Sequence, residues 1–278
     1  MLAHKLIFMD LDGTLLNSEK KISPKTHYPL IAAQQEGAKL VLASGRPLPG
    51  ILPLAKGLQM DIYEGFLISF NGAQVMDCKT GQVLYNKTMT VEEGQAILQH
   101  VENFDVIPMV VKDDYTYVQN VFAGHLDLAG TDFNVIDYEA HSNGYKLCEV
   151  DNMAVFADFP LNKILLAGQP EYLDQHYQEI SVPFGDEVNA MFTAPFYYEF
   201  TAKGIDKAKA IDTIFKPMGY QPEDMIAFGD GQNDATMVAY VGLGFAMENA
   251  VDMLKEIADK ETKSNDQDGI AYALENLI

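Results

Sequence analysis

Short apolar runs that end in polar residues recur along the chain, and stretches with helical spacing separate them. Four such runs lie at residues 5–9, 40–43, 66–70 and 225–228. Runs of this length, bounded by turn-forming residues, are typical of strands buried on both faces. After the first run, Ser23-Pro24 predicts a helix that continues toward Glu36 and ends at Gly37. This alternation predicts an α/β fold near both ends of the chain.

The pattern changes in the middle third of the chain. A capping box, Thr90-x-x-Glu93, begins a helix, and residues 107–119 then alternate apolar and polar positions as a β-hairpin does. Further expected elements are strands at 163–167 and 188–192 and a helix at 170–178. We therefore interpret residues 86–195 as an inserted α+β domain, and residues 1–85 and 196–278 as one α/β core.

The charge of the chain limits the partners that the protein can bind. The 278 residues carry a formal net charge of −21, and an acidic surface repels both nucleic acid and anionic membranes. No apolar run approaches the roughly 18–20 residues of a membrane span, and no signal-peptide pattern opens the chain. We expect a soluble, cytoplasmic protein that binds neither nucleic acid nor membrane. Nothing in the sequence indicates an oligomeric partner.

Asp10 and Asp12 follow the first apolar run and precede Gly13, whose backbone freedom suits a sharp turn. Residues i and i+2 of a strand share a face, so we expect both carboxylates to point into one cleft beyond the strand. Carboxylates this close repel each other unless a cation lies between them or one carries a proton. The pair could supply a nucleophile and an acid. The alternative is an acidic turn at a strand end.

The second strand end carries Ser44-Gly45-Arg46-Pro47, and Arg46 is the only arginine in the chain. The Ser44 hydroxyl and the Gly45 N–H can donate to a phosphate oxygen where a helix begins near Pro47. The alternative is a strand followed by an ordinary helix start.

Residues 203–207, Lys-Gly-Ile-Asp-Lys, follow the apolar run 196–200. Asp206 suits the N-cap of a helix, which places Lys207 in the first helical turn. A positive charge there opposes the helix dipole at a cost of about 0.3–1 kcal/mol, and an anion in front of it would remove the conflict. Lys207 is thus a candidate phosphate ligand. Lys203 is the second candidate, and a solvated lysine is the alternative.

The last apolar run ends in an acidic loop, Asp230-Gly-Gln-Asn-Asp, which leads into a helix. Carboxylates suit Mg²⁺, which keeps several waters and takes one or two carboxylates from the protein. Asp230 lies at the strand end, and Asp234 lies near the helix start, where it could act merely as an N-cap.

Four expected strand ends therefore carry, in order, paired Asp, Ser, Lys and paired Asp. In an open α/β sheet, ligands bind beyond the carboxyl ends of the strands. The set contains a nucleophile, a proton donor, hydroxyl and ammonium groups that bind phosphate, and a metal site. These are the parts of a phosphoryl-transfer centre.

The chain resembles the haloacid dehalogenase (HAD) superfamily phosphatases, and within them the Cof-type sugar phosphatases. The segments that carry the resemblance are Asp10-Leu-Asp-Gly-Thr, Ala43-Ser-Gly-Arg-Pro, Lys203-Gly-Ile-Asp-Lys, Gly229-Asp-Gly-Gln-Asn-Asp and Asn265-Asp-Gln-Asp-Gly-Ile-Ala. One departure is Ala208, where the third motif commonly has glycine. The resemblance implies a Rossmann-like parallel-sheet core with an inserted α+β cap that closes over the active site. It also implies that the loop Asn71-Gly72 lies near the substrate.

The resemblance further implies a Mg²⁺-dependent phosphatase that hydrolyses a small phosphorylated metabolite, such as a sugar phosphate, through an aspartyl-phosphate. Asp10 would be the nucleophile, and Asp12 the general acid and base. Mg²⁺ would be held by Asp10, Asp230 and the backbone carbonyl of Asp12, with Asp234 orienting the waters of the metal. The remaining phosphoryl oxygens would be held by Ser44, Lys207, Asn233 and the N–H groups of Leu11 and Gly45.

Two other functions are compatible with the same residues. A phosphosugar mutase would transfer the phosphoryl group from Asp10 to a second hydroxyl instead of water. A receiver-type signalling module also uses clustered Asp, Ser or Thr, Lys and Mg²⁺. A receiver, however, is a single domain of roughly 100–150 residues, without a large insertion.

Overall fold

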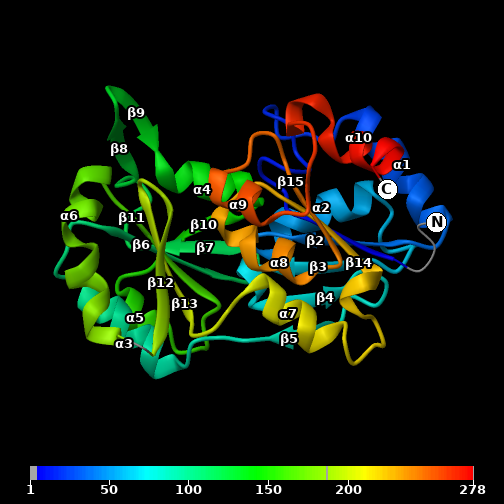
Figure 1. Ribbon diagram of the computed structural model, residues 1–278. Coiled ribbons are helices and arrows are strands. Elements are labelled where there is room, and N and C mark those ends of the chain that lie inside the picture. Colours follow the sequence, from blue (N-terminus) through cyan, green and yellow to red (C-terminus); the bar gives the residue numbers. More distant parts are fainter. Residues whose placement is uncertain (1–4, 186, 278) are drawn as a thin grey trace. The chain divides into compact units, whose positions relative to one another are not determined.

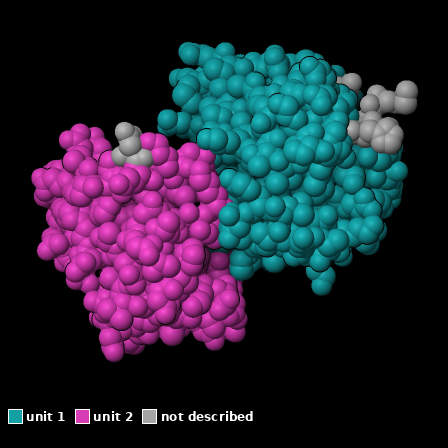
Figure 2. Space-filling view, turned by 90° about the horizontal axis from the view of Figure 1, so that it is seen from below, with its two compact units in different colours: residues 1–86, 206–278 teal, residues 87–205 magenta. Residues whose placement is uncertain are grey.

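The computed structural model describes residues 5–185 and 187–277, and the chain divides into two compact units. Unit 1 comprises residues 1–86 and 206–278, and unit 2 comprises residues 87–205 (Figure 2). Unit 2 is thus a continuous segment between the two parts of unit 1. Its first boundary lies next to the predicted one, whereas its second lies ten residues beyond the predicted end at 195.

An eight-stranded sheet forms the centre of unit 1, in the order β16-β15-β14-β1-β2-β3-β4-β5. Neighbours from β16 to β3 are parallel, and β4 and β5 are added antiparallel. The strands are Leu6–Met9 (β1), Lys39–Ala43 (β2), Phe66–Ser69 (β3), Gln74–Asp77 (β4), Val83–Asn86 (β5), Met225–Gly229 (β14), Leu243–Ala246 (β15) and Lys260–Glu261 (β16). The four apolar runs of the sequence are therefore strands of one sheet, as predicted.

Helices cover both faces of this sheet because the strand order grows in opposite directions from β1. Right-handed crossovers then place α1 and α2 on one face and α8 and α9 on the other. Figure 1 shows α1 packed with α10, away from α7 and α8. The helices are Pro24–Gln35 (α1), Leu48–Gly57 (α2), Lys207–Ile214 (α7), Ala235–Tyr240 (α8), Asp252–Ile257 (α9) and Gly269–Asn276 (α10), with 3₁₀ turns Phe70–Gly72 (η1), Pro222–Asp224 (η3), Gln232–Asp234 (η4) and Asn265–Gln267 (η5).

Aromatic side chains hold α7 against the sheet of unit 1. Phe215, the C-cap of α7, is fully buried and packs edge to face against Phe8 and Phe66, with ring centroids 5.3 and 5.0 Å away. Edge-to-face pairs of this kind add to the hydrophobic contribution of the buried rings. The C-terminal end of α7 is therefore fixed relative to β1 and β3.

Unit 2 is built on a six-stranded sheet in the order β10-β7-β6-β11-β13-β12, with a separate hairpin, β8-β9. Its strands are Ile107–Lys112 (β6), Tyr115–Val118 (β7), His125–Leu128 (β8), Thr131–Asn134 (β9), Lys146–Glu149 (β10), Lys163–Ala167 (β11), Val188–Ala194 (β12) and Tyr197–Ala202 (β13). Its helices are Val91–Val101 (α3), Val135–Asn143 (α4), Met153–Phe156 (α5), Pro170–Ser181 (α6) and the 3₁₀ turn Val182–Phe184 (η2). The predicted capping box at Thr90 and Glu93 is present. The unit is α+β, as predicted.

One strand belongs to a different sheet from the predicted one. The sequence places the apolar run 196–200 in the core, directly before the lysine motif. Instead, β13 pairs antiparallel with β11 and β12, and Tyr198 and Phe200 are buried in unit 2. Periodicity identifies a strand but does not specify which sheet accepts it. The structure divides the chain at 205/206, ten residues after the boundary predicted at 195/196. Lys207 begins α7 with Asp206 as the N-cap, as the sequence predicts.

The helices of residues 5–185 and 187–277 include none that is both long and apolar enough to cross a membrane.

Candidate active site

The order of the strands changes direction beside β1, whose neighbours are β14 and β2. The loops after these three strands carry Asp10, Asp230 and Ser44 at the same edge of the sheet. The Asp10 N–H donates to the carbonyl oxygen of Phe228 (3.1 Å), which ties the loop after β1 to β14. Open α/β sheets bind ligands at such a reversal. The first, second and fourth motifs therefore meet as the sequence predicts.

Lys207 brings the third motif to the same place from the first turn of α7. Its Nζ lies 2.7 Å from Asp10 Oδ1, 2.6 Å from Asp234 Oδ1 and 2.7 Å from the Ala43 carbonyl oxygen. Burial alone would lower the pKa of this lysine, but the two carboxylates outweigh burial and raise its pKa above the ordinary value. Lys207 is only 1% exposed and stays charged. The anions expected in front of it are Asp10 and Asp234.

Asp234 is fully buried, and both of its oxygens have partners. Oδ1 faces Lys207, whereas Oδ2 accepts hydrogen bonds from the N–H groups of Asp230 (3.0 Å) and Gly231 (2.9 Å). Asp234 is the N-cap residue of α8, but its side chain makes no capping hydrogen bond to that helix. The side chain instead folds the acidic loop back on itself and so fixes Asp230.

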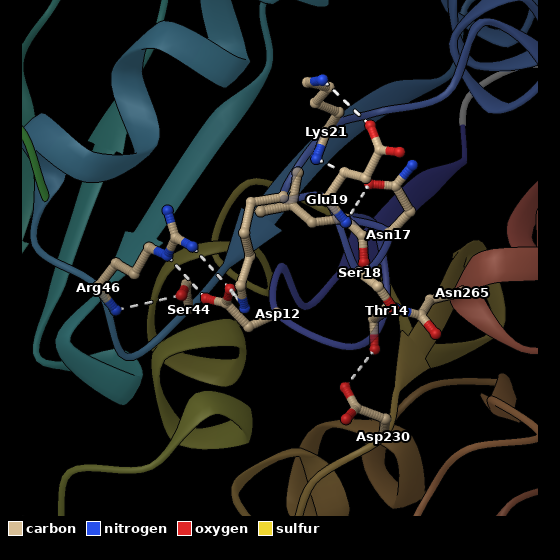
Figure 3. Close-up of polar contacts among 12 residues, drawn as sticks. Asp12, Thr14, Asn17, Ser18, Glu19, Lys21, Ser44, Arg46, Asp230 and Asn265 are labelled. Atoms are coloured by element: carbon tan, nitrogen blue, oxygen red, sulfur yellow. Dashed lines mark hydrogen bonds and ion pairs between the residues drawn. The ribbon is translucent and has the colours of Figure 1, made fainter. Parts of the chain in front are cut away.

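Asp230 faces the loop after β1. Its Oδ1 accepts a hydrogen bond from Thr14 Oγ1 at 2.7 Å (Figure 3). Gly13 has a φ of +87°, and a Cβ added there would overlap Asp230 Oδ2, so this position requires glycine. Burial raises the pKa of Asp230 to about 6; the Thr14 hydrogen bond opposes this rise, and the charge of Asp234 adds to it.

The carboxylates of Asp10, Asp230 and Asp234 form a group that fits a divalent cation. One oxygen from each lies within 4.8 Å of the others. Burial and the charge of Asp234 raise the pKa of Asp10 well above its ordinary value, although Lys207 opposes them. With Lys207 the group carries a formal charge of −2, which a divalent cation would neutralise. Because the oxygens of Asp234 are engaged, Asp10 and Asp230 are the carboxylates that could hold Mg²⁺, which commonly takes one or two.

The structure does not bring the Asp12 side chain into this group. Its carboxylate accepts hydrogen bonds from Arg46 Nε (2.7 Å) and Nη2 (2.6 Å) (Figure 3). It also accepts a hydrogen bond from Lys20 Nζ (2.8 Å). Burial would raise the pKa of Asp12, but these hydrogen bonds lower it below the ordinary value. The Asp12 carboxylate is thus paired with Arg46 and Lys20 and does not form the close pair with Asp10 that strand alternation predicts. The alternation of a strand does not extend to Asp12, because β1 ends at Met9.

The loop after β2 carries Ser44 and Gly45 between the strand and α2, where the sequence places them. Ser44 is buried, and its Oγ accepts a hydrogen bond from the Arg46 N–H at 3.1 Å, which leaves the hydroxyl hydrogen to donate elsewhere. Gly45 lies beside Asn71, whose side chain would be 3.1 Å from a Cβ at position 45.

Two other predicted residues frame the site. Asn233 is exposed, and its Nδ2 donates to Asn71 Oδ1 at 3.0 Å. Leu11 is fully buried, and its carbonyl oxygen accepts from the N–H groups of Thr14 and Leu16, which closes the turn after β1. Lys203, the second lysine candidate, is exposed and belongs to unit 2.

Three residues of the site were not predicted from the sequence. Arg46 holds Asp12, Thr14 holds Asp230, and Asn249 Nδ2 donates to the Gly13 carbonyl oxygen at 2.8 Å. The sole arginine of the chain, next to a candidate phosphate loop, was a usable signal for the first. Thr14 lies inside the first motif, where its hydroxyl could have been considered. The partner of Asn249 is far away in sequence, and no local pattern indicates it.

Comparisons with known proteins define the class to which this fold and site belong. Residues 7–274 match the family of haloacid dehalogenase-like hydrolases. The chain is 29% identical over 279 residues to a 5-amino-6-(5-phospho-D-ribitylamino)uracil phosphatase of Bacillus subtilis, covering 99% of this chain and 96% of that protein.

Two solved structures share the fold over nearly the whole chain. A haloacid dehalogenase-like hydrolase from Bacteroides thetaiotaomicron has a TM-score of 0.90 and 31% identity, covering 99% of both chains. A sugar phosphatase of HAD subclass IIB has a TM-score of 0.79 and 26% identity, covering 98% of both chains. The protein belongs to the haloacid dehalogenase-like hydrolases, and it is an enzyme of the phosphatase class. The resemblance drawn from the motifs is confirmed.

Proposed function

We propose that the protein is a Mg²⁺-dependent phosphatase that hydrolyses a small phosphorylated metabolite through an aspartyl-phosphate on Asp10. The main support for this proposal is the position of Asp10. Its carboxylate is buried beside the Lys207 ammonium and within reach of Asp230. A carboxylate in such a place can attack phosphorus while fixed positive charge stabilises the phosphoryl oxygens.

Asp10 and Asp230 would hold the metal ion, which supplies positive charge to the phosphoryl oxygens when bound. Lys207, which remains charged, would keep Asp10 oriented. Its three hydrogens are donated to Asp10, Ala43 and Asp234 in this structure, so it would hold a phosphoryl oxygen by sharing or exchanging one of these hydrogen bonds. The Ser44 hydroxyl, Asn233 and the N–H groups of Leu11 and Gly45 would bind the other oxygens. Asp234 would keep Asp230 in position through the loop that it folds.

Asp12 would exchange the protons of the reaction. Its lowered pKa means that it is ionised before substrate binds, since Arg46 and Lys20 stabilise its charge. The approach of a phosphate dianion would raise this pKa, because like charges favour the protonated form. Asp12 could then protonate the leaving oxygen and afterwards take a proton from the water that cleaves the aspartyl-phosphate.

The substrate class is supported by the relatives. One matched structure is named as a sugar phosphatase, and the Bacillus relative is named for a phosphorylated ribityl compound. We propose a phosphate ester of a sugar or sugar alcohol as the substrate of this chain, with unit 2 as the cap that selects it.

A panel of phosphorylated sugars and sugar alcohols, assayed for phosphate release with and without a chelator, tests the proposal. We expect turnover that a chelator abolishes and added Mg²⁺ restores, whereas Asp10→Asn should lose turnover while keeping its fold by circular dichroism. A folded Asp10→Asn enzyme with more than a few per cent of the activity would exclude Asp10 as the nucleophile. Transfer of the phosphoryl group to a second sugar hydroxyl, without phosphate release, would indicate a mutase instead.

A further inference from the structure

The turn that follows β3 has an unusual backbone. Phe70, Asn71 and Gly72 have φ values of 50°, 55° and 106°, three successive residues in a region that favours glycine. A side chain such as that of phenylalanine is unfavourable there, and such strain persists only where the surroundings impose it. Contacts of η1 within unit 1 show what imposes it.

The first contacts of this turn are to the loop after β2. The Phe70 N–H donates to the Arg46 carbonyl oxygen (3.1 Å), and the Asn71 N–H donates to the Ser44 carbonyl oxygen (3.0 Å). Ser44 in turn donates its N–H to Ile68 in β3 (2.9 Å). The backbone of Ser44 is therefore held on both sides by β3 and by the strained turn.

The second contact is to the start of α7. A Cβ added to Gly72 would lie 2.6 Å from the carbonyl carbon of Asp206 and 3.0 Å from the Lys207 nitrogen. Backbone thus packs directly on backbone at the residue that carries the buried ammonium. Glycine is required at position 72 both for this approach and for its φ.

The third contact is made by a side chain. Asn71 Oδ1 accepts the hydrogen bond from Asn233 Nδ2 at 3.0 Å. Asn233 is the middle residue of η4, the 3₁₀ turn of the acidic loop, and it is exposed, so few packing contacts restrict its rotamer. The hydrogen bond to Asn71 is what fixes the direction of this amide.

We infer that the turn Phe70–Gly72 sets the spacing of the phosphate-binding groups, and that Asn71 is a positioning residue that acts through Asn233. This inference rests on the proposed function, because it concerns the same site. The turn contacts each of the three segments that carry Ser44, Lys207 and Asn233. Asn71 itself accepts from Asn233 through Oδ1 and donates its N–H to the Ser44 carbonyl oxygen. The strain of the turn is retained because relaxing it would separate these segments.

A double-mutant cycle on the full-length protein tests the role of Asn71. Asn71→Gly removes the side chain but keeps the backbone N–H and suits the left-handed φ, so the variant should fold. With p-nitrophenyl phosphate and Mg²⁺, we expect about a tenfold loss in kcat/KM and a similar loss in inhibition by orthophosphate, as for one lost hydrogen bond. In an Asn233→Ala background, Asn71→Gly should have no further effect.

Gln59→Gly is the matched control. Gln59 has a φ of 55°, is exposed and lies at the end of α2, so glycine relieves the same kind of strain away from the site. Gln59→Gly should leave kcat/KM and the inhibition by orthophosphate unchanged. An Asn71→Gly enzyme with wild-type constants, or with the same loss in the Asn233→Ala background, would overturn the inference.

Calorimetric titration of orthophosphate with Mg²⁺ separates this inference from the proposed function. If the wild-type protein hydrolyses no phosphate ester, the proposed function fails. Binding of orthophosphate that weakens in Asn71→Gly but not in Gln59→Gly would still support the positioning role. Equal binding to all three proteins would overturn it.

Discussion

The Lys207 ammonium is enclosed by three oxygen acceptors, from Asp10, Asp234 and Ala43. A buried charge is tolerated only where partners of this quality replace water. The same enclosure leaves Asp10 and Asp230 with raised pKa values, because one ammonium does not neutralise three carboxylates. The residues of the site are thus arranged for ligand binding at the expense of the stability of the metal-free protein.

Asp230→Asn should therefore stabilise the metal-free protein at neutral pH. The ordinary pKa of 3.8 rises to about 6 in the folded state, so the folded state binds more protons than the unfolded state between these values. The free energy of unfolding consequently falls as pH rises through this window, and the penalty is fully present above about pH 6. Asparagine removes the charge while keeping an oxygen that can accept from Thr14.

Denaturant unfolding in chelator, at pH 5 and pH 7.5, checks this expectation. The free energy of unfolding of the variant should exceed that of the wild type by more at pH 7.5 than at pH 5. Mg²⁺ should stabilise the wild type but not the variant. A variant less stable than the wild type at pH 7.5 in chelator would show that the charge of Asp230 does not destabilise the folded, metal-free protein.

Asp12→Asn should slow the turnover of alkyl and aryl phosphates by different amounts. A nitrophenolate leaves without a proton, so the general-acid contribution of roughly 10²–10⁴ should be lost for alkyl phosphates but largely spared for aryl phosphates in the first step. Breakdown of the aspartyl-phosphate still needs a base, so p-nitrophenyl phosphate should show a burst followed by slow turnover. Pre-steady-state kinetics measure both. Equal losses without a burst would mean that Asp12 serves only to organise the loop with Arg46.

Single elements decide how these residues meet. In unit 2, β11, β13 and α4 enclose a second buried lysine, Lys163, whose Nζ lies 3.1 Å from Glu199 and 3.9 Å from Glu139. Thr193 Oγ1 donates to the same Glu199 oxygen at 3.1 Å. Burial opposes the charge of Lys163, but the two carboxylates outweigh burial and raise its pKa above the ordinary value. This ion pair joins the strand that the sequence misplaced to its neighbours in unit 2.

Lys163→Met should destabilise unit 2 by about 3–5 kcal/mol, because it leaves two buried carboxylates without their cation. Lys216→Met is the matched control, since Lys216 pairs with Asp212 at 3.1 Å at the exposed C-terminal end of α7, where an ion pair contributes about 0–1 kcal/mol. Urea unfolding of both variants measures the difference. Equal losses, or a stable Lys163→Met protein, would show that the buried ion pair contributes little.

At the scale of the whole molecule, one of the two units is formed by a single segment of the chain and the other by two segments. Unit 2 is one uninterrupted segment with its own hydrophobic clusters, whereas unit 1 joins two segments that share one mainly parallel sheet. The strands β1 and β14, which precede Asp10 and Asp230, come from the two different segments of unit 1. The sheet edge that brings Asp10 and Asp230 together therefore exists only when both segments of unit 1 have paired.

Residues 87–205 produced alone should fold. All strand pairs of the six-stranded sheet and of the hairpin β8-β9 lie within this segment, so we expect native-like circular dichroism and cooperative unfolding. Residues 1–86 alone should remain unfolded, because β1 would lack β14. A fragment 87–205 without cooperative unfolding would show that unit 2 depends on unit 1.

Local patterns in the sequence determined the strands, the caps and the chemistry of the site. Buried strands produce apolar runs, caps have their own residue preferences, and carboxylates, Ser44 and Lys207 at element ends indicate phosphoryl transfer. Tertiary structure alone decided that β13 joins unit 2, that Asp12 pairs with Arg46, and that Asn71 holds Asn233. These choices depend on partners distant in sequence, and no local spacing specifies which of several compatible partners will be close in the folded chain.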